Sequence, residues 1–583
     1  MTTLLLAFAL QFQAALPSDS VEAIRRAARR AEARFERLSR QLAPLQWGSS
    51  SGSDCDEIVG RFCLTYDSGR PPSPGPEAGR VTDARREAIE ALRHAFSFEA
   101  HQLETAGPLV RYLVEDDRSA EAVSAARTYA ALSGDSVWGP LLLGFAQHSA
   151  ANDTAAERLF DEGLARLPAE DRRRIENVEW ILAPDDRRAY KRMEPAARAR
   201  AEARLWHHSD ALFLTPGSEI RAEHIARRVW SRVLSMTPLV SDMVRWGEDL
   251  EQLTVRYGVP TARSRTSGSV YREGSLVEHF DPAQLSYVQA ELLTRGPAPT
   301  PVAGETWSLE EPRSRSGYAP RSIRRLMALD HQITRFPVGD SVIVRVDGEF
   351  VLDSAASGQQ RVVTGLWIQD AGTFTTLGEQ RGSATVANDT ARFALELPTG
   401  AGARLYSFEV FEPETRLGGR ARYVTDIDPP SDGLLVSDPL IARAFAENAP
   451  PTHRRDAELH PLGRLVVEPG AQVGLYAEAS GLERAARGER LYRVELSIRR
   501  ADRAAFPARA LSWLGRRLGL SGERVPPRVA WNGRVEGAGP AVLAVNLGLE
   551  DLPEGLHAVA LTLTDLVAGT TATSTKVIRI AKP

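Results

Sequence analysis

The chain has 583 residues, of which 43% are apolar and 25% are charged, a composition typical of soluble globular proteins. At that length we expect about four domains. The formal net charge of −4 excludes an overall positive field that would hold nucleic acid. Two cysteines are too few for a four-cysteine zinc site, a cysteine-ligated iron–sulfur cluster or a disulfide-rich scaffold.

Residues 1–16 are predicted to be a signal peptide. Residues 4–16, LLLAFALQFQAAL, form an apolar run that ends just before Pro17. A helix needs about 20 residues to cross a bilayer, so this run is too short to span one, but it is typical of the apolar core of a secretory signal. We therefore expect export to the periplasm or the cell surface. A buried N-terminal helix is the alternative.

The two cysteines, Cys55 and Cys63, lie in the sequence CDEIVGRFC. In an exported chain the simplest interpretation is one disulfide that closes a small local loop. Two free buried thiols in a cytosolic protein are the alternative. The spacing excludes a CxxC redox motif and a CxxCH haem-attachment motif.

Residues 17–205 are predicted to form an α-helical domain. Apolar residues recur at helical spacing along 21–42, and Asp19 with Glu22 resembles a capping box at its start. Five arginines lie between Arg25 and Arg34, interleaved with Glu22 and Glu32. Because these arginines lack aromatic stacking partners, we interpret them as a solvated helix face and not as a nucleic-acid site.

Residues 103–170 contain two copies of a helical pattern. The better copy spans 137–170 and has five characteristic residues: Leu143 and Gly144 in its first helix, Ala156 and Phe160 in its second, and Pro168 after them. The preceding copy retains Ala122 and Ala126. The pattern resembles the tetratricopeptide repeat, and the resemblance implies a concave surface that binds a peptide or protein partner, lined here by Leu143 and Gln147. A stack of α-hairpins that only supports other domains is the alternative.

The region 206–334 carries a series of short motifs. Its first part contains, in order, Trp206, Asp210, Thr215-Pro216-Gly217-Ser218-Glu219, Glu223-His224, Arg227-Arg228-Val229, Arg245-Trp246-Gly247-Glu248-Asp249 and Arg256-Tyr257-Gly258-Val259-Pro260. Further on stand His331-Gln332-Ile333 and Phe336-Pro337-Val338-Gly339-Asp340-Ser341. In this order they resemble the bacterial GWxTD-domain family, named for a Gly-Trp-x-Thr-Asp motif. Its members are typically exported, often carry helical repeats and have no established biochemical activity.

The sequence departs from the family motif at several positions. Arg245 replaces the motif Gly, Glu248 replaces Thr, and Thr261 stands where many members have Asp, so that Trp246 and Asp249 are the matching positions. We interpret Trp246 as a large apolar plug and Asp249 as a helix cap or salt-bridge acceptor. Alternation along 253–257 predicts a short strand closed by a turn at 258–260.

A metal site is the rival interpretation of this region. Nitrogen and oxygen ligands are available from His207, His208, Asp210, Glu219, Glu223 and His224. However, HExxH is absent, and no two of these histidines stand four residues apart. We therefore expect helix caps and surface ion pairs, with no metal or cofactor.

The C-terminal part is predicted to be antiparallel β structure, with a β-sandwich at 335–436 and an immunoglobulin-like β-sandwich at 437–583. Apolar residues alternate there with period two. The alternating sets are Val342, Val344 and Val346; Tyr406, Phe408 and Val410; and Tyr492, Val494, Leu496 and Ile498. Turns are expected at Asp347-Gly348 and Pro469-Gly470. The segment 551–580 resembles the closing hairpin of an immunoglobulin-like domain.

Two segments of this part invite other interpretations. Asp426-x-Asp428 followed by Asp432-Gly433 could suggest calcium, but the distal Glu of a calcium loop is missing, and we expect an interdomain turn. The insert 505–530 is predicted to form a short helix that covers a sheet edge.

The motifs of common enzymes are absent or misplaced. Neither a dinucleotide-binding fingerprint nor a P-loop occurs, and the one GxSxG, at 48–52, lies in a low-complexity tract. We expect an α + β multidomain, non-catalytic interaction or scaffold protein of the bacterial envelope, with a protein or peptide partner at its helical repeats. We expect no nucleic-acid partner and no membrane span after signal cleavage. The alternatives are an enzyme using Asp249, Glu248, His224 or His279, and a structural subunit of an envelope assembly.

Overall fold

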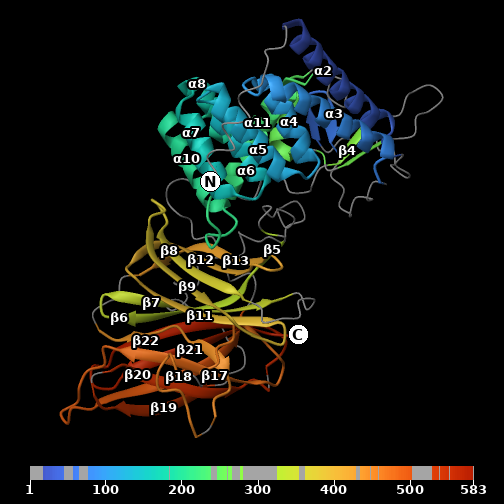
Figure 1. Ribbon diagram of the computed structural model, residues 1–583. Helices are drawn as coiled ribbons and strands as arrows, with labels where there is room; N and C mark the ends of the chain where they lie inside the picture. The colour runs from blue at the N-terminus through green and yellow to red at the C-terminus, as the bar shows by residue number, and fades with distance from the viewer. Residues whose placement is uncertain are drawn as a thin grey trace, which may run out of the picture. The chain divides into compact units, whose positions relative to one another are not determined.

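The chain divides into two compact units, which we call the helical unit and the β unit (Figure 1). The helical unit takes in residues 1–211, 216–294 and 312–322, and the β unit takes in 212–215, 295–311 and 323–583. The computed structural model describes residues 18–44, 57–64, 76–182, 184–237, 246–258, 260, 262–265, 276–279, 323, 325–352, 361–428, 433–446, 448–456, 459–501, 528–537, 539–550 and 552–581. Helices followed by sheets confirm the predicted α + β class.

The helical unit consists mainly of consecutive helices. Their bounds are α2 (Ser18–Gln41), α3 (Gly79–Glu99), α4 (Leu103–Glu115), α5 (Ser119–Ser133), α6 (Trp138–Ser149), α7 (Asp153–Ala165), α8 (Ala169–Glu176), the 3-10 turn η1 (Glu179–Ile181), α9 (Pro184–Lys191), α10 (Pro195–Ser209), α11 (Glu219–Ser235) and α12 (Glu248–Tyr257). Two small antiparallel hairpins accompany them, β1 (Glu57–Val59) with β2 (Phe62–Leu64), and β3 (Ala262–Arg265) with β4 (Leu276–His279). The helix predicted at 21–42 is confirmed as α2.

From α2 to α7, each helix packs against the next along the chain. Small residues allow the close approach: Ala122 and Ala126 of α5 are fully buried. A Cβ at Gly144 of α6 would lie only 2.7 Å from the ring of Phe160 of α7. The predicted helical pair at 137–170 is therefore present as α6 and α7, joined by a short turn.

Helix α11 packs against α4 and α6, although more than 50 residues separate it in sequence from α7 (Figure 1). Trp230 of α11 meets Phe145 of α6 edge to face, with ring centroids 5.0 Å apart. A Cβ at Gly107 of α4 would lie 3.2 Å from Met236, just after α11. Helix α11 thus covers the side of α6 that carries Phe145, whereas Leu143 and Gln147, the residues predicted to line the partner surface, are half-buried.

Residues 253–257, predicted to be a short strand, lie inside helix α12, so that prediction is wrong. Leu250, Leu253 and Tyr257 repeat at helical spacing and are buried. The acidic first turn favours a helix N-terminus because the helix dipole is positive there. Gly258 ends the helix at φ +77°, a conformation that glycine adopts without steric cost.

The first part of the β unit has two sheets around one core. Its strands are β5 (Arg325–Ala328), β6 (Asp330–Val338), β7 (Ser341–Val351), β8 (Val363–Asp370), β9 (Thr376–Ser383), β10 (Thr385–Ala387), β11 (Thr390–Thr399), β12 (Gly402–Glu412) and β13 (Leu417–Ile427). The sheet orders are β10-β11-β7-β6 and β5-β13-β12-β8-β9. Val344, Phe408 and Leu366, from both sheets, share the buried cluster between them.

Asp347-Gly348, predicted to be a turn, lies inside strand β7, so that prediction is also wrong. Gly348 pairs with Phe393 of β11 across the sheet. A Cβ at Gly348 would overlap the ring of Phe393. The glycine therefore marks a close packing contact inside the sheet and not a reversal of the chain.

The second part of the β unit also has two sheets around one core. Its strands are β14 (Leu435–Val436), β15 (Leu440–Arg443), β16 (Val466–Val467), β17 (Gln472–Ser480), β18 (Arg490–Arg500), β19 (Arg528–Val535), β20 (Ala541–Gly548), β21 (Gly555–Asp565) and β22 (Thr571–Ile580). β17 pairs with β14, β15 and β20, and the other sheet has the order β16-β22-β21-β18-β19. The predicted closing hairpin is confirmed as β21 and β22, and the predicted turn at Pro469-Gly470 precedes β17, with Gly470 at φ +81°.

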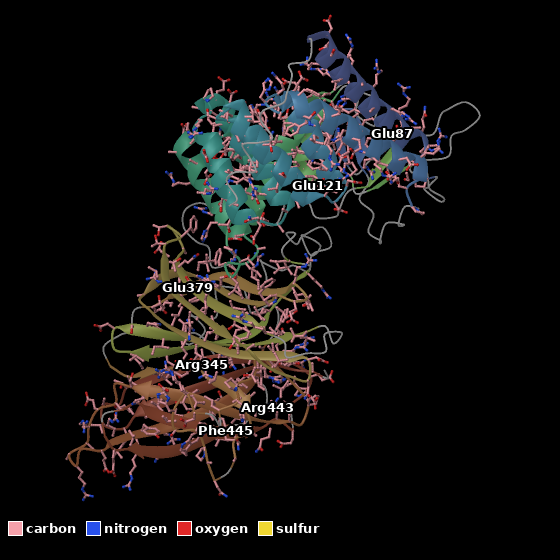
Figure 2. All side chains as sticks on the ribbon, viewed as in Figure 1. Glu87, Glu121, Arg345, Glu379, Arg443 and Phe445 are labelled. Atoms are coloured by element: carbon pink, nitrogen blue, oxygen red, sulfur yellow. The ribbon has the colours of Figure 1, made fainter. Side chains whose placement is uncertain are left out.

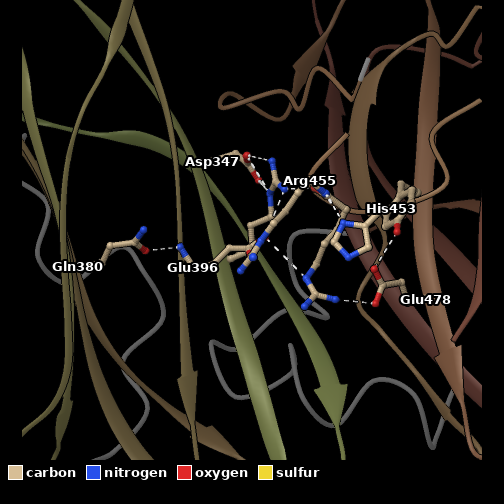
Figure 3. A network of polar contacts seen from close by, with 9 residues as sticks. Asp347, Gln380, Glu396, His453, Arg455 and Glu478 are labelled. Atoms are coloured by element: carbon tan, nitrogen blue, oxygen red, sulfur yellow. Dashed lines mark hydrogen bonds and ion pairs between the residues drawn. The ribbon is translucent and has the colours of Figure 1, made fainter. Parts of the chain in front are cut away.

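A polar network joins the two parts of the β unit (Figure 3). Arg345 of β7 contacts Asp347 at 2.8 Å and donates a hydrogen bond to the backbone carbonyl of Arg454. Arg454 in turn pairs with Glu478 of β17 at 2.9 Å. The exposed Arg455 reaches Glu396 of β11 at 2.7 Å. Arg345 and Asp347 are both buried. Removing either side chain would therefore leave the other charge without its partner inside the interface.

Several predictions lie outside the residues that the structure describes. These are the signal peptide at 1–16, the GxSxG at 48–52, Cys55, Arg245, Val259, Thr261, Asp432, most of the insert at 505–530 and the side chains of Cys63, His208 and His279. The predicted disulfide is therefore untested. Among the described helices, none is both long enough and apolar enough to cross a membrane.

Candidate functional site

The motif residues at 219–229 and 246–258 lie on or beside helices α11 and α12 of the helical unit, whereas His331-Gln332-Ile333 lie in strand β6 of the β unit. Helix α11 begins after Ser218 with Glu219 in its first turn, where a carboxylate suits the helix dipole. Ile225, Val229 and Trp230 attach one face of α11 to the core of the helical unit. Among the buried or half-buried polar side chains of the same helix are Glu223, His224, Arg227 and Arg228. The hydrogen bonds and ion pairs of these side chains show whether the region can serve in catalysis or only in packing.

Asp249, the motif carboxylate, holds the hairpin β1–β2. Its Oδ2 accepts a hydrogen bond from Nε of Arg61 at 2.5 Å, and its Oδ1 accepts one from the Nη2 of Arg61 at 2.7 Å. Oδ1 also accepts the backbone N–H of Leu250 at 2.9 Å. These hydrogen bonds, chiefly that from Arg61, lower the pKa of Asp249 to about 2. We call this pair the Arg61–Asp249 clasp.

The backbone of the hairpin fits closely around the clasp. Gly60 adopts φ +54°, and a Cβ there would overlap the Cβ of Asp249. Beside the clasp, Val59 of the hairpin is buried against Leu253 and Tyr257 of α12, with Phe62 half-buried next to them. An isolated two-stranded hairpin is at best marginally stable, so α12 provides both the apolar and the ionic support that this one needs.

His148 of α6 connects to Glu223 through a buried ion-pair network. Its Nδ1 lies 2.6 Å from Asp153 of α7, and its Nε2 lies 2.6 Å from Glu223 of α11. Because both ring nitrogens face carboxylates, the ring is the doubly protonated imidazolium, which donates to each. Burial lowers the pKa of His148, but the hydrogen bonds to Asp153 and Glu223 outweigh it and raise the pKa to about 9.

Arg227 extends this network to the end of α12. Its Nε donates to Glu223 at 2.5 Å, and its Nη1 donates to the backbone carbonyl of Arg256 at 2.8 Å. Although burial alone would raise the pKa of Glu223, the charges of Arg227 and His148 hold it well below its ordinary value. One guanidinium thus satisfies a carbonyl that the end of a helix leaves without an intrahelical partner.

His224 and Arg228 face a different side of α11. The Nε2 of His224 lies 3.1 Å from the backbone carbonyl of Ile175, and its ring lies 5.1 Å from that of Trp206. Burial, with nearby Arg228, depresses the pKa of His224 well below its ordinary value, so the ring is neutral. Arg228 stacks on Trp180 at 4.4 Å and pairs with Glu251 of α12 at 3.3 Å. These contacts fasten α11 to its neighbours.

The motif segment 212–217 contributes to both units along the chain. Residues 212–215 belong to the β unit, where the backbone N–H of Leu214 donates to Glu409 at 2.9 Å. The guanidinium of Arg422 stacks on Phe213 at 3.8 Å. Both faces of strand β12 are therefore buried. The alternation at 406–410 predicted that only the apolar face would be buried and that the polar face would be exposed. In the helical unit, Pro216 accepts a hydrogen bond from Thr154, and Gly217 adopts φ +99°.

The residues of the predicted enzyme alternative have separate partners. Asp249 binds Arg61, His224 lies against Trp206 and Ile175, and Glu248 is exposed. Trp246, predicted to be a plug, is half-buried just before α12. Within the part of the chain that the structure describes, no cluster of three His, Cys, Asp or Glu residues could hold a metal ion.

Sequence reasoning missed three residues of this region, Arg61, His148 and Asp153. They lie in segments far from the motif along the chain, and no spacing rule connects them to it. No protein-family model matches the chain, and no curated protein matches it. The geometry of the motif residues is therefore the basis for assigning a function.

Proposed function

We propose that the chain is an exported, non-catalytic interaction or scaffold protein of the bacterial cell envelope, and a member of the GWxTD-domain family. The observation that carries the proposal is the Arg61–Asp249 clasp, in which the motif carboxylate fastens a hairpin to a helix. A carboxylate with a pKa of about 2, already holding a guanidinium, is a poor general base near neutral pH. The motif then serves as a structural joint, by which we mean that Asp249 fixes the hairpin β1–β2 to helix α12.

The helical unit is proposed to contain tetratricopeptide-like repeats that bind a protein or peptide partner. The close contact of Gly144 with Phe160 and the buried Ala122 and Ala126 support that repeat type. Because α11 covers α4 and α6, we place the partner on the outward side of α5. Leu132 of that helix is 58% exposed, which is high for a leucine in a packed helical array.

The β unit is proposed to consist of two immunoglobulin-like sandwiches that act as a spacer. Two sheets share one core in each part, which supports this architecture. In the second part, β15 pairs antiparallel with β17, whereas β16 pairs parallel with β22 of the other sheet. Together β15 and β16 resemble the first strand of an immunoglobulin-like domain, of which one half pairs with one sheet and the other half with the second sheet.

An enzyme at this region is the alternative, and no contact of Asp249 or His224 favours it. General acid–base catalysis needs two titratable groups converging on one substrate position. Here Asp249 contacts the hairpin at Arg61, while His224 contacts the backbone of Ile175. A structural subunit of an envelope assembly remains compatible with the β unit but has no separate observation in its favour.

The experiment is affinity capture and cross-linking with the full chain from envelope extracts of its native host. Leu132→Glu in α5 is compared with Val529→Glu in β19, because the two side chains are 58% and 56% exposed. We expect a reproducible partner that the Leu132 variant loses and the Val529 variant retains. Failure to capture any partner, or equal loss with both variants, would contradict binding at the helical repeats.

A further inference from the structure

The charges of helix α2 are segregated between its two sides. Glu32 and Glu36 are buried, at 3% and 0% exposure. Glu36 accepts hydrogen bonds from Nη2 of Arg111 at 2.7 Å and from the hydroxyl of Tyr112 at 2.9 Å. The sequence interpretation placed Glu32 among the surface arginines, and that is wrong, because this carboxyl group lies against the helical core.

The outward side of α2 therefore carries only positive charge over its middle three turns. Its exposed charged residues there are Arg26, Arg29, Arg30, Arg34 and Arg37. Of these, Arg34 pairs with Glu87 of α3. Within the described part of the chain, Arg26, Arg30 and Arg37 form no ion pair. Figure 2 shows nitrogen-tipped side chains along the outer side of α2 and labels Glu87.

Among the described residues, the neighbouring helix α3 neutralises this arginine face only at Arg34. Its exposed Asp83 pairs with Arg86 at 3.0 Å, and its exposed Glu90 pairs with Arg93 at 2.7 Å. Both pairs are internal to α3, at the i, i+3 spacing that brings side chains together on one helix. The other two carboxylates of α3, Glu87 and Glu99, pair with Arg34 and Arg25 of α2. Arg26, Arg30 and Arg37 therefore keep no ion pair among the described residues.

We propose that the arginine face of α2 binds the surface of an anionic phospholipid bilayer. Arg26, Arg30 and Arg37, which form no ion pair within the described residues, follow one another along one side of the helix in a straight row about 16 Å long. A straight row of guanidiniums matches a plane of phosphate groups, which arginine binds through paired N–H donors. The apolar side of α2 is occupied by the core, so binding is electrostatic and does not require insertion.

Two further features favour a bilayer over other anionic partners. The face between Arg26 and Arg37 has no exposed aromatic side chain on which bases could stack, which disfavours single-stranded nucleic acid. In the sequence, α2 begins two residues after the apolar run 4–16, which is predicted to be a signal peptide, so export by this route would bring α2 close to a membrane. An acidic protein would also attract the arginines, but its binding would not depend on the position of α2 next to the apolar run.

The test is co-sedimentation of the full chain with vesicles of phosphatidylcholine alone and of phosphatidylcholine mixed with phosphatidylglycerol. We expect binding to the mixed vesicles only, and binding that weakens as salt rises. Arg26→Gln, Arg30→Gln and Arg37→Gln together should weaken it about 100-fold. The matched control removes the same charge from Arg127, Arg158 and Arg173, exposed arginines of α5, α7 and α8, and should change it little.

Three outcomes would overturn the proposal. Equal binding to both kinds of vesicle would assign the interaction to the apolar run. Equal weakening by both triple variants would assign it to net charge alone. Absence of binding to either vesicle would leave an acidic protein as the partner of the arginine face. Circular dichroism melting of each variant confirms that α2 remains folded, since the substituted side chains are exposed and unpaired within the described residues.

Discussion

His148 is the residue whose charge depends most directly on the packing of the helical unit. Its two carboxylate partners come from different helices, Asp153 from α7 and Glu223 from α11. The imidazolium therefore joins α6 and α11 as well as α6 and α7. A neutral ring could donate only one of the two hydrogen bonds, and the other carboxylate would lose its charged partner.

The stability of the helical unit should consequently fall at alkaline pH. The pKa of His148 is raised from 6.5 to about 9 in the folded chain. Stabilisation by the imidazolium is therefore complete below pH 6.5 and is lost as pH rises through 9. We expect the free energy of unfolding, followed by circular dichroism of the helices, to drop by up to about 3 kcal/mol across that window. In His148→Gln the drop should be much smaller; an unchanged pH profile would contradict the ion-pair network.

Glu32 gives a second pH dependence in a different window. Burial raises the pKa of Glu32 from 4.5 to about 7, so the folded chain keeps a proton that the unfolded chain releases. Stability then falls as pH rises from 4.5 to 7. Glu32→Gln should raise the free energy of unfolding at pH 8 by about 1–3 kcal/mol and change it little at pH 4. Glu36→Gln, which weakens the contacts to Arg111 and Tyr112, should destabilise at pH 8.

At the scale of elements, some glycines of this chain mark close packing and not turns. Gly144 and Gly348 lie inside a helix and a strand, and a Cβ at either would meet an aromatic ring. The repeat-like pattern predicted that Gly144 lies in a helix, and this is confirmed because Gly144 lies in α6. Asp347-Gly348 was predicted as a turn from its dipeptide alone, which carries no information about Phe393 on another strand.

Gly144 provides the test at this scale. Alanine normally favours a helix over glycine by about 1 kcal/mol. Gly144→Ala should nevertheless destabilise the helical unit by about 1–3 kcal/mol, because the new Cβ would lie 2.7 Å from Phe160. Gly79→Ala, at the start of α3 with open space around it, should be neutral or stabilising in the same thermal unfolding measurement. Equal effects of the two substitutions would mean that α6 and α7 are less closely packed.

At the scale of the whole chain, the sequence predicted the classes of element better than their long-range contacts. Periodicity identified α2, the pair α6–α7 and the hairpin β21–β22, since each depends on local pattern. Helix α12 was mistaken for a strand because its apolar residues fit both periods over so short a window. The position of α11 over α4 and α6 follows from packing between distant segments, which no local pattern encodes.

The candidate site shows the same limit. Asp249 was predicted as a cap or salt-bridge acceptor, and it accepts Arg61, but Arg61 lies 188 residues earlier and nothing in the sequence connects the two. Likewise Glu223 and His148 are 75 residues apart. Buried ion pairs of this kind are visible only once both elements are placed, because their stability depends on shared burial.

Hydrogen exchange at the hairpin 57–64 in Asp249→Asn tests the central claim, that the motif carboxylate is a structural joint. We expect exchange of the hairpin amides to become about tenfold faster, since the charged hydrogen bonds to Arg61 are lost, while amides of α6 and α7 are unaffected. Arg61→Gln should give the same result, with little further effect in the double variant. Asp83→Asn, which breaks an exposed pair in α3, is the control. Unchanged exchange at 57–64 in Asp249→Asn would contradict the account.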